Sequence, residues 1–520
     1  MSVLPYHNEP LTDFSQESNR RLMSAGLTEV KGRLDRLYSM VIGPSKVLSE
    51  AELVSTNPGN PAQVIGRVAK ANQTHIDEAL RVAWQAFERW KRVPGAARAR
   101  YLYKAAAIMR RRKFELAAWE ILEAGKTWAE ADGDVAEAID FLEYYGRQLE
   151  RLSQGVPLVP LPGEDDTAFY QPLGVGAIIP PWNFPLAILT GMTSAAIVAG
   201  NAVLLKPASA TPIIAAQFVE IMEEAGLPAG VLNFVPGDGG VIGDHLVTHP
   251  LTRFISFTGS REVGLRINRL AAEHQPGQRW IKRVVAEMGG KDAIVVDETA
   301  DLEAACQGIV QSAFGFQGQK CSACSRAIVV DSVYEMVLER VVELTRDLKV
   351  GSAETYEHQM GPVIDAQAFS KIASYIDWGR EHARLVYGGE RETNPNQNGY
   401  FIAPTVVADV EPGSKLEQEE IFGPVLAFVR AKDFTHALQI ANDTEYGLTG
   451  SVYSKRRDRI EQAREEFYVG NLYINRKCTG AVVGAHPFGG FNMSGTDSKT
   501  GSPNYVLQFM QMKAVAEQYS

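Results

Sequence analysis

The stretch from Thr167 to Leu205 contains no charged residue, and this constrains the fold of the chain more than any other feature of its sequence. Pro180, Pro181 and Pro185 divide the stretch into pieces shorter than the roughly 20 residues that a membrane-spanning helix needs. We therefore interpret it as part of a buried protein core rather than a membrane segment.

Apolar strands alternate with amphipathic helices through most of the chain. The first unit is predicted as a strand at 175–179, a helix at 185–199 and a strand at 202–206, and further units follow it. A second alternating run extends from about 292 to about 476, whereas the first 150 residues appear mostly helical. This pattern predicts an α/β fold in which helices cover parallel sheets.

Length and charge limit the kinds of partner that the chain can bind. With 520 residues it is long enough for several domains, and its formal charge of -10 argues against a polyanionic partner. The first 20 residues are polar and show no apolar signal segment. We expect a cytoplasmic protein with a small-molecule substrate, without nucleic-acid or membrane partners.

The segment GFQGQKCSACSR, from Gly315 to Arg326, holds two of the four cysteines, Cys321 and Cys324. The pair could be half of a zinc site, a redox pair, or a nucleophile with an incidental neighbour. Cys306 and Cys478 are too distant in sequence to form a second close pair, and we expect no suitably spaced histidines. We therefore predict no metal.

Two further motifs supply groups that a catalytic cysteine requires. Asn183 in PWNFP could donate a hydrogen bond to an oxyanion, together with the backbone N–H of Cys321. Glu287 in EMGGK ends a buried strand, where partial desolvation would make it a general base. Taken singly, Asn183 could be a helix cap, Glu287 a paired core carboxylate and Cys321 a small core residue; together they favour catalysis.

These motifs also occur in a familiar order. PWNFP, KPA, FTGSREVG, EMGGK, GQKCSA, EEIFGPV and PFGG follow one another as in the NAD(P)-dependent aldehyde dehydrogenase superfamily, which the chain resembles from about residue 50 to its end. The resemblance implies a Rossmann-like cofactor domain, an α/β catalytic domain and a small oligomerisation flap. The corresponding ranges are 1–45 for an N-terminal arm, 46–150 and 172–288 for the NAD(P)-binding domain, 289–478 for the catalytic domain, and 151–171 and 490–520 for the flap.

The resemblance also implies roles for individual residues. Cys321 would attack an aldehyde, Asn183 would hold the resulting oxyanion, and Glu287 would activate water to cleave the thioester. Cys324 would only pack beside the nucleophile. The positions implied to bind the cofactor are Ile179, Trp182, Lys206, Ser209, Gly237, Gly259, Ser260, Met288, Glu420 and Phe422.

Longer strings, including NLYINRKCTGAVVGAHPFGGFNMSGT, resemble the branch of the superfamily that oxidises L-glutamate γ-semialdehyde to glutamate in proline catabolism. That substrate carries an amino acid head group, whose carboxylate needs cationic or N–H donors. The positions implied to bind it are Phe184, Lys320, Ser322, Gly480, Ala481 and Phe488. Lys320 could instead be a structural lysine that contacts local carbonyls.

Ser209 departs from a common pattern of the superfamily, in which a glutamate at this position repels the 2′-phosphate of NADP. We therefore expect NAD as the preferred cofactor, with NADP accepted. Three alternatives remain: a dehydrogenase for another semialdehyde such as succinic semialdehyde, a non-redox thioester or ester hydrolase, and a catalytically idle member. We expect a homo-oligomer, either a dimer or an assembly of dimers.

Overall fold

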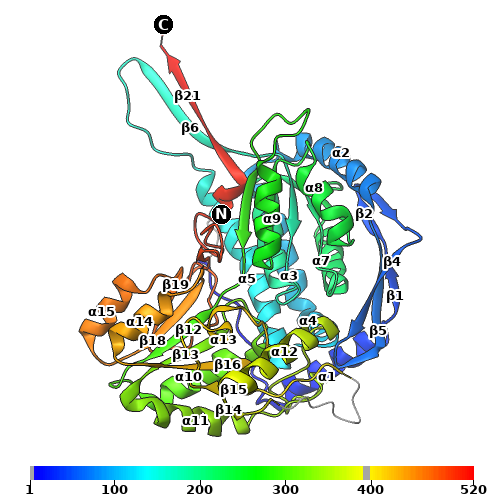
Figure 1. The fold of residues 1–520 in the computed structure, drawn as a ribbon. Coiled ribbons are helices and arrows are strands. Elements are labelled where there is room, and N and C mark those ends of the chain that lie inside the picture. The colour runs from blue at the N-terminus through cyan, green and yellow to red at the C-terminus, as the bar shows by residue number, and fades with distance from the viewer. Residues whose placement is uncertain (1–4, 390–398, 520) are drawn as a thin grey trace.

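Two seven-stranded sheets, each mostly parallel, form the centres of the molecule (Figure 1). The computed structural model describes residues 5–389 and 399–519. The predicted α/β fold is confirmed, because helices cover both faces of each sheet.

The first sheet has the order β11-β10-β7-β8-β9-β2-β3. The five strands from β11 to β9 are parallel, and a short antiparallel hairpin of β2 and β3 extends the edge at β9. The strands are β2 (Met40–Ile42), β3 (Ser45–Val47), β7 (Val175–Ile179), β8 (Ala202–Leu205), β9 (Leu232–Phe234), β10 (Phe254–Thr258) and β11 (Arg283–Glu287).

Two separate apolar clusters pack on the faces of this sheet. One face is covered by α3 (Gly95–Arg111), α4 (Lys113–Ala124), α5 (Trp128–Leu152), α6 (Ala187–Val198) and α7 (Pro212–Glu224), with α1 (Glu17–Lys31) beside them. The other face is covered by α2 (Gln73–Trp90), α8 (Asp244–Thr248) and α9 (Arg261–Ala272). Side chains of β7 alternate between the clusters: Ile178 faces the first and Ala177 the second.

The second sheet has the order β14-β15-β16-β13-β12-β18-β19, with only β14 antiparallel. Its strands are β12 (Asp292–Val296), β13 (Cys324–Val330), β14 (Arg384–Tyr387), β15 (Thr405–Ala408), β16 (Val425–Ala431), β18 (Thr449–Tyr453) and β19 (Asn471–Ile474). Its helices are α10 (Leu302–Phe314), α11 (Tyr334–Arg346), α12 (Ala366–His382), α13 (Lys415–Gln418), α14 (Phe434–Asn442) and α15 (Arg457–Glu466).

The predicted first unit is confirmed as β7, α6 and β8, and the second run is confirmed between β12 and β19. The sequence pattern did not reveal the strands before residue 70. In addition to β2 and β3, these are β1 (Arg36–Tyr38), β4 (Glu52–Asn57) and β5 (Asn60–Ala69), of which β1, β5 and β4 form a separate three-stranded sheet. They were missed because several are only three residues long and expose many of their side chains.

A two-stranded antiparallel ribbon projects from the body of the molecule (Figure 1). It pairs β6 (Glu164–Pro172) with β21 (Met510–Gln518). Residues 490–509 lie elsewhere: a short strand, β20 (Phe491–Asn492), pairs with β17 (Tyr446–Gly447). A 3₁₀ turn at Tyr505–Phe509 joins the first core cluster. Among the described residues 490–519, therefore, only the final strand belongs to the ribbon.

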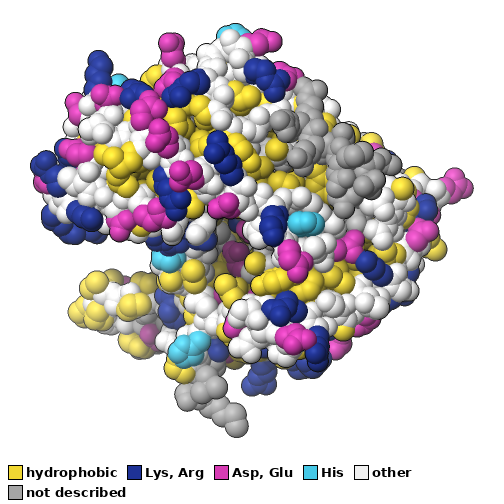
Figure 2. Space-filling model, turned by 90° about the horizontal axis from the view of Figure 1, so that it is seen from below, with side chains coloured by type: hydrophobic (Ala, Val, Ile, Leu, Met, Phe, Trp, Pro, Cys, Tyr) yellow, Lys and Arg dark blue, Asp and Glu magenta, His cyan; other side chains and the backbone are white. Residues whose placement is uncertain are grey.

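On the face shown in Figure 2, basic and acidic side chains are interspersed without an extended field of one sign. Within residues 5–389 and 399–519, no helix is both long and apolar enough to cross a membrane.

Arg326 is the central polar side chain of the second half of the molecule. It lies on β13 with 2% of its side chain exposed, and it forms an ion pair with the equally buried Glu417 of α13. Its guanidinium also donates to the backbone carbonyls of Lys291, Ile440 and Ala441. One side chain thus joins the strand after Cys321 to α13 and α14.

We predict that Arg326→Met destabilises the protein by about 3–5 kcal/mol, because it leaves the Glu417 carboxylate buried without a cation. The double variant Arg326→Met/Glu417→Leu should recover most of this loss. Arg384→Met, which removes a half-exposed ion pair with Asp409, should cost at most about 1 kcal/mol. Denaturant unfolding of the three variants measures the ranking, and equal losses for Arg326→Met and Arg384→Met would contradict it.

Candidate active site

The chain passes from the first sheet to the second through Met288, Gly289 and Gly290, with hardly any space around the backbone. A side-chain carbon on Gly289 would overlap the carboxylate of Glu420, and one on Gly290 would lie 2.5 Å from the carbonyl oxygen of Cys321. The N–H of Gly290 donates to Glu420 Oε1 at 3.1 Å. The link between β11 and β12 therefore runs directly between Cys321 and Glu420.

Cys321 lies in a tight loop between α10 and β13. Phe316 and Gln317 have positive φ angles of 48° and 55°, and they are followed by Gly318 at 65°. A side chain on Gly318 would overlap the backbone of Gly423, so only glycine fits at this position. The loop holds Cys321 half-buried at the junction of the two sheets.

The thiol of Cys321 is surrounded by acidic groups. Burial raises its pKa well above the usual range, and the nearby carboxyl groups of Asp292, Glu420 and Glu287 raise it further. Cys321 is therefore a protonated thiol in the free chain at neutral pH, and it needs a proton acceptor before it can act as a nucleophile.

Asn183 and Glu287 have the placement that catalysis would require. Asn183, which follows β7, is buried and donates one side-chain N–H to the carbonyl of Gln319 at 3.0 Å. Because a carboxamide has two N–H groups, the second remains available next to the Cys321 loop.

Glu287 lies at the carboxyl end of β11 and is buried. Its Oε1 accepts a hydrogen bond from Ser498 Oγ at 2.9 Å, and its Oε2 accepts one from the N–H of Gly490 at 3.1 Å. Burial raises the pKa of Glu287 to about 7, while these two hydrogen bonds lower it in part. Sequence reasoning did not identify Ser498, since nothing in the pattern links it to a residue more than 200 positions earlier.

The residues expected at the cofactor site follow the carboxyl ends of the first sheet. The strand order reverses between β7 and β10, and such a switch point forms a crevice where nucleotides bind. Ile179 ends β7, and Trp182 follows it. Gly259 follows β10, and Ser260 caps α9 by accepting the N–H of Val263.

Two contacts define the walls of this crevice. A side chain on Gly264 would overlap the sulfur of Met288, so α9 packs closely on the link between the sheets. Trp182 meets Phe422 edge-to-face, with ring centroids 5.5 Å apart, and Phe422 adopts a φ of 61°.

Lys206, Ser209 and Gly237 lie beyond the neighbouring strands. The amine of Lys206 is buried, and it donates to the carbonyl of Pro207 at 3.2 Å. Burial lowers its pKa to about 8. Ser209 is exposed, and Gly237 is buried in the turn after β9. Among the described residues, no carboxylate lies within ion-pair distance of Lys206, so this amine is available to a ligand.

The residues expected to bind substrate include one unforeseen ion pair. Lys320 Nζ lies 2.8 and 2.7 Å from the two carboxylate oxygens of Glu130, a residue of α5. The partner of Lys320 is thus a carboxylate of another helix rather than a local carbonyl. The carboxylate of Glu130 therefore partly balances the positive charge of Lys320. These two side chains form a mixed-charge wall beside Cys321.

Ser322 is buried, and its carbonyl accepts hydrogen bonds from Thr449 Oγ1 and Cys478 Sγ. The second bond, at 3.4 Å, brings the loop with Gly480 and Ala481 beside Ser322. Gly480 has a φ of 77° and is exposed.

Phe184 and Phe488 contribute aromatic rings from two other segments. The Phe184 ring lies 4.3 Å from the ammonium group of Lys126. The backbone of Phe488 pairs with Thr500, close to the segment that holds Glu287.

Sequence reasoning missed the acidic face of α5. Glu130, Asp134 and Glu137 are spaced i, i+4 and i+7, so they lie on one side of the helix. Asp134 pairs with the fully buried Lys126 at 2.8 Å. Burial, followed by the charge of Asp134, raises the pKa of Glu137 to about 8, whereas Lys126 and Lys320 lower it. The spacing of the three acids could have revealed this face.

Cys324 is the first residue of β13, so it lies after the Cys321 loop rather than in it. It is fully buried, and its thiol contacts the carbonyl of Arg326 at 3.4 Å. All four cysteines are free.

A half-buried cysteine in a tight loop and a buried carboxylate thus lie where two α/β sheets meet. The chain belongs to the aldehyde dehydrogenase family, whose sequence model matches residues 47–515. More particularly, it is 59% identical over 517 residues to the 1-pyrroline-5-carboxylate dehydrogenase of Geobacillus kaustophilus, covering 99% of this chain and all of that protein.

Two crystal structures extend the comparison. The 1-pyrroline-5-carboxylate dehydrogenase of Thermus with bound NAD superposes with a TM-score of 0.98 at 52% identity, and both chains are covered completely. The NAD-dependent aldehyde dehydrogenase of Sinorhizobium meliloti has a TM-score of 0.88 at 31% identity, covering 94% of this chain and 96% of the other.

We predict that Gly290→Ala lowers kcat by about 100-fold, because the added carbon displaces the Cys321 backbone by a fraction of an ångström or more. Gly133→Ala is the matched control, since no atom lies within 4 Å of the added carbon in α5. Steady-state kinetics and melting temperatures measure both variants. Full activity in Gly290→Ala would show that the Cys321 loop tolerates displacement.

Proposed function

We propose that this chain oxidises L-glutamate γ-semialdehyde, which is in equilibrium with 1-pyrroline-5-carboxylate, to L-glutamate with NAD in proline catabolism. The single observation that carries the proposal is the mixed-charge wall beside Cys321, where Lys320 pairs with Glu130. The 59% identity to a 1-pyrroline-5-carboxylate dehydrogenase supports the same substrate.

The residues of the crevice fit a dinucleotide. Within residues 5–389 and 399–519, the buried amine of Lys206 has one carbonyl acceptor, so the hydroxyl and phosphate oxygens of a cofactor would supply the others. Ser260 and the start of α9 offer N–H donors to a phosphate, and Glu420 can accept from a ribose hydroxyl. NAD, when bound there, would accept hydride from the aldehyde carbon of the substrate.

The remaining chemistry is assigned to three residues of the chain. The Cys321 thiol would pass its proton to a water molecule as its Sγ adds to the aldehyde carbon, and the second N–H of Asn183 with the Cys321 backbone N–H would stabilise the oxyanion. Oxidation leaves a thioester on Cys321. Glu287 then accepts a proton from the water that cleaves it, which releases the carboxylate product and the thiol.

The head group of the substrate carries a negative carboxylate and a positive ammonium group. The mixed-charge wall likewise carries a positive charge on Lys320 and a negative charge on Glu130. Ser322 and the backbone N–H groups at Gly480 and Ala481 face the α-carboxylate together with Lys320, while the acids of α5 attract the α-ammonium group. Phe184 and Phe488 would flank the methylenes. Succinic semialdehyde has no ammonium group, so it would gain no attraction from the acids of α5.

Two of the alternative functions are less well supported. A hydrolase without a cofactor would have no use for the unpaired Lys206 amine or for the carboxylate of Glu420 against Gly290. An idle protein would have no chemical reason to keep Glu287 buried with a raised pKa near a thiol.

Ser209 is exposed and uncharged, so it does not repel a 2′-phosphate and offers no cation to bind one. We therefore propose that NAD is preferred and NADP is accepted, with only a modest difference in kcat/KM.

We further propose that the chain forms a homo-oligomer through the ribbon of β6 and β21. The ribbon and the segment before it expose apolar side chains, namely Leu158, Val159, Leu161, Phe169, Met512 and Val515.

The domain arrangement proposed for the chain keeps a cofactor domain around the first sheet and a catalytic domain around the second, with the flap narrowed to this ribbon. Four free thiols fit a reducing, cytoplasmic location.

We predict that turnover depends on a group with a pKa near 7, because Glu287 must be ionised to act as the base. Below this pH, kcat should fall about tenfold per unit, and above it kcat should level off. Glu287→Gln should lower steady-state kcat by about 100-fold or more, yet retain a rapid first burst of NADH.

Stopped-flow mixing with NAD and substrate measures the burst. The control is Glu273→Gln, because Glu273 is an exposed residue directly after α9. If Glu287→Gln folds but loses the burst, Glu287 acts before hydride transfer.

We predict that L-glutamate γ-semialdehyde has the highest kcat/KM, ahead of succinic semialdehyde and propanal. Ser322→Ala should raise KM for the amino acid semialdehyde by at least about tenfold, because a donor to the carboxylate is lost. KM for propanal should be unchanged, which makes propanal the internal control. If succinic semialdehyde or propanal is the better substrate of the unaltered enzyme, the substrate proposal is wrong while the membership of the family stands.

A further inference from the structure

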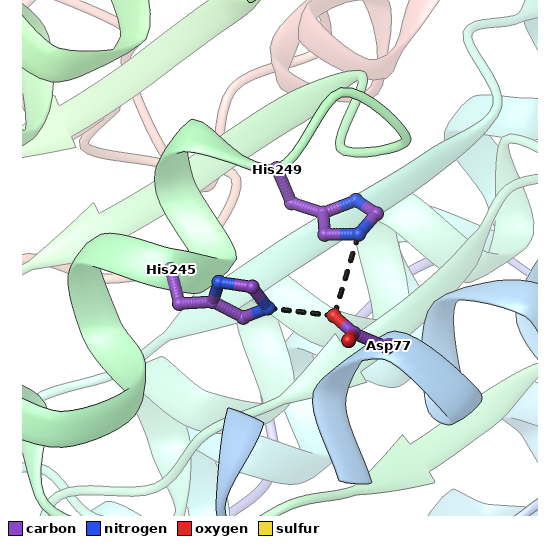
Figure 3. A group of neighbouring side chains, drawn as sticks. All are labelled: Asp77, His245 and His249. Atoms are coloured by element: carbon purple, nitrogen blue, oxygen red, sulfur yellow. Dashed lines mark hydrogen bonds and ion pairs between the residues drawn. The ribbon is translucent and has the colours of Figure 1, made fainter. Parts of the chain in front are cut away.

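Two histidines and an aspartate meet between α2 and α8, away from the Cys321 site (Figure 3). His245 and His249 are four residues apart in HLVTH, and both rings point towards Asp77 of α2. The expectation that no histidines are suitably spaced for a metal is therefore wrong. An H-x-x-x-H spacing places two imidazoles on one side of a helical turn.

The donor atoms converge on a small volume. His245 Nε2 lies 2.6 Å and His249 Nε2 lies 3.4 Å from the same oxygen, Asp77 Oδ1. All three donor atoms lie within 4.8 Å of one another, and the rings are nearly perpendicular at 77°. Zinc bonds of about 2.0–2.2 Å place tetrahedral ligand atoms about 3.3 Å apart, so insertion of an ion requires the distances between donor atoms to change by up to about 1.5 Å.

The charged side chains next to these three donors have other partners. Asp244, the nearest other carboxylate on α8, is paired with Arg266 of α9. Lys282, the cation next to His249, donates to the carbonyl of Val247 at 2.6 Å.

One hydrogen bond opposes metal binding. His249 Nδ1 accepts the N–H of Leu251 at 3.1 Å, so the proton of the neutral ring lies on Nε2, facing Asp77. A metal on Nε2 moves that proton to Nδ1 and breaks the bond to Leu251. The affinity should therefore be moderate rather than that of a closed four-ligand structural site.

We propose that Asp77, His245 and His249 form a binding site for a divalent transition-metal ion, with Zn²⁺ as the preferred species. Two imidazole nitrogens and one carboxylate oxygen are a donor set that zinc accepts and that magnesium and calcium do not favour. The three side chains are partly exposed, so water can complete the coordination. The ion would fasten α8 to α2 and take no part in the chemistry at Cys321.

The position of α8 gives this clamp a structural consequence. The helix follows the turn with Gly237 and Asp238, and Asp238 pairs with Lys70 in the segment that leads into α2. A metal between α2 and α8 would therefore close a second link across the same boundary. The clamp should raise stability without altering kcat.

The test is calorimetric titration of metal-free Cys321→Ala protein with Zn²⁺, where the substitution removes the half-buried thiol as a competing ligand. We expect one Zn²⁺ per chain and a rise in melting temperature of about 2 °C at a hundredfold excess over Kd. His245→Ala and Asp77→Asn should each weaken binding at least about tenfold, whereas His274→Ala, an exposed histidine elsewhere, should not.

Substitution of Co²⁺ identifies the ligands, because nitrogen and oxygen coordination lacks the charge-transfer band of a thiolate. Absence of Zn²⁺ binding, equal binding of Mg²⁺, a thiolate band, or unchanged affinity in the His245 and Asp77 variants would each overturn the proposal. If His245→Ala does not fold, Asp77→Asn, which keeps the shape of the side chain, decides the outcome.

Discussion

The structure depends on one close approach, the passage of the β11–β12 link between the Cys321 carbonyl and the Glu420 carboxylate. Neither Gly289 nor Gly290 has room for a side-chain carbon, and the N–H of Gly290 is held by Glu420. This passage joins the sheet that would carry the cofactor to the sheet that carries the nucleophile loop. It sets the distance between two halves that otherwise have separate cores.

Burial acts on the pKa values of three ionisable groups of the candidate site in different directions. It raises the pKa of Cys321 and of Glu287, and it lowers that of the Lys206 amine. In each case the charged form loses hydration, so the neutral thiol, carboxylic acid and amine are favoured. A carboxylate with a pKa near 7 is partly ionised at neutral pH, so Glu287 could accept a proton from water that cleaves a thioester on Cys321.

The mixed-charge wall beside Cys321 is held together by ion pairs. Lys320 comes from the nucleophile loop, and its partner Glu130 comes from α5, almost 200 residues earlier. The same helix face carries Asp134, which holds the fully buried Lys126. Charges of both signs on one surface suit a zwitterionic head group better than an anion, and this distinguishes an amino acid semialdehyde from succinic semialdehyde.

The sequence by itself determined the α/β class, the strand and helix of the PWNFP segment, and the candidate roles of Cys321, Asn183 and Glu287. These features are local, since side-chain periodicity and short motifs decide them. It did not reveal the strands before residue 70, the Ser498 and Gly490 contacts of Glu287, or the pairing of Lys320 with Glu130. Only the tertiary structure decided these, because each joins segments whose separation in the chain carries no periodic signal. The same reason applies to Asp77, which packing alone brings to the two histidines of α8.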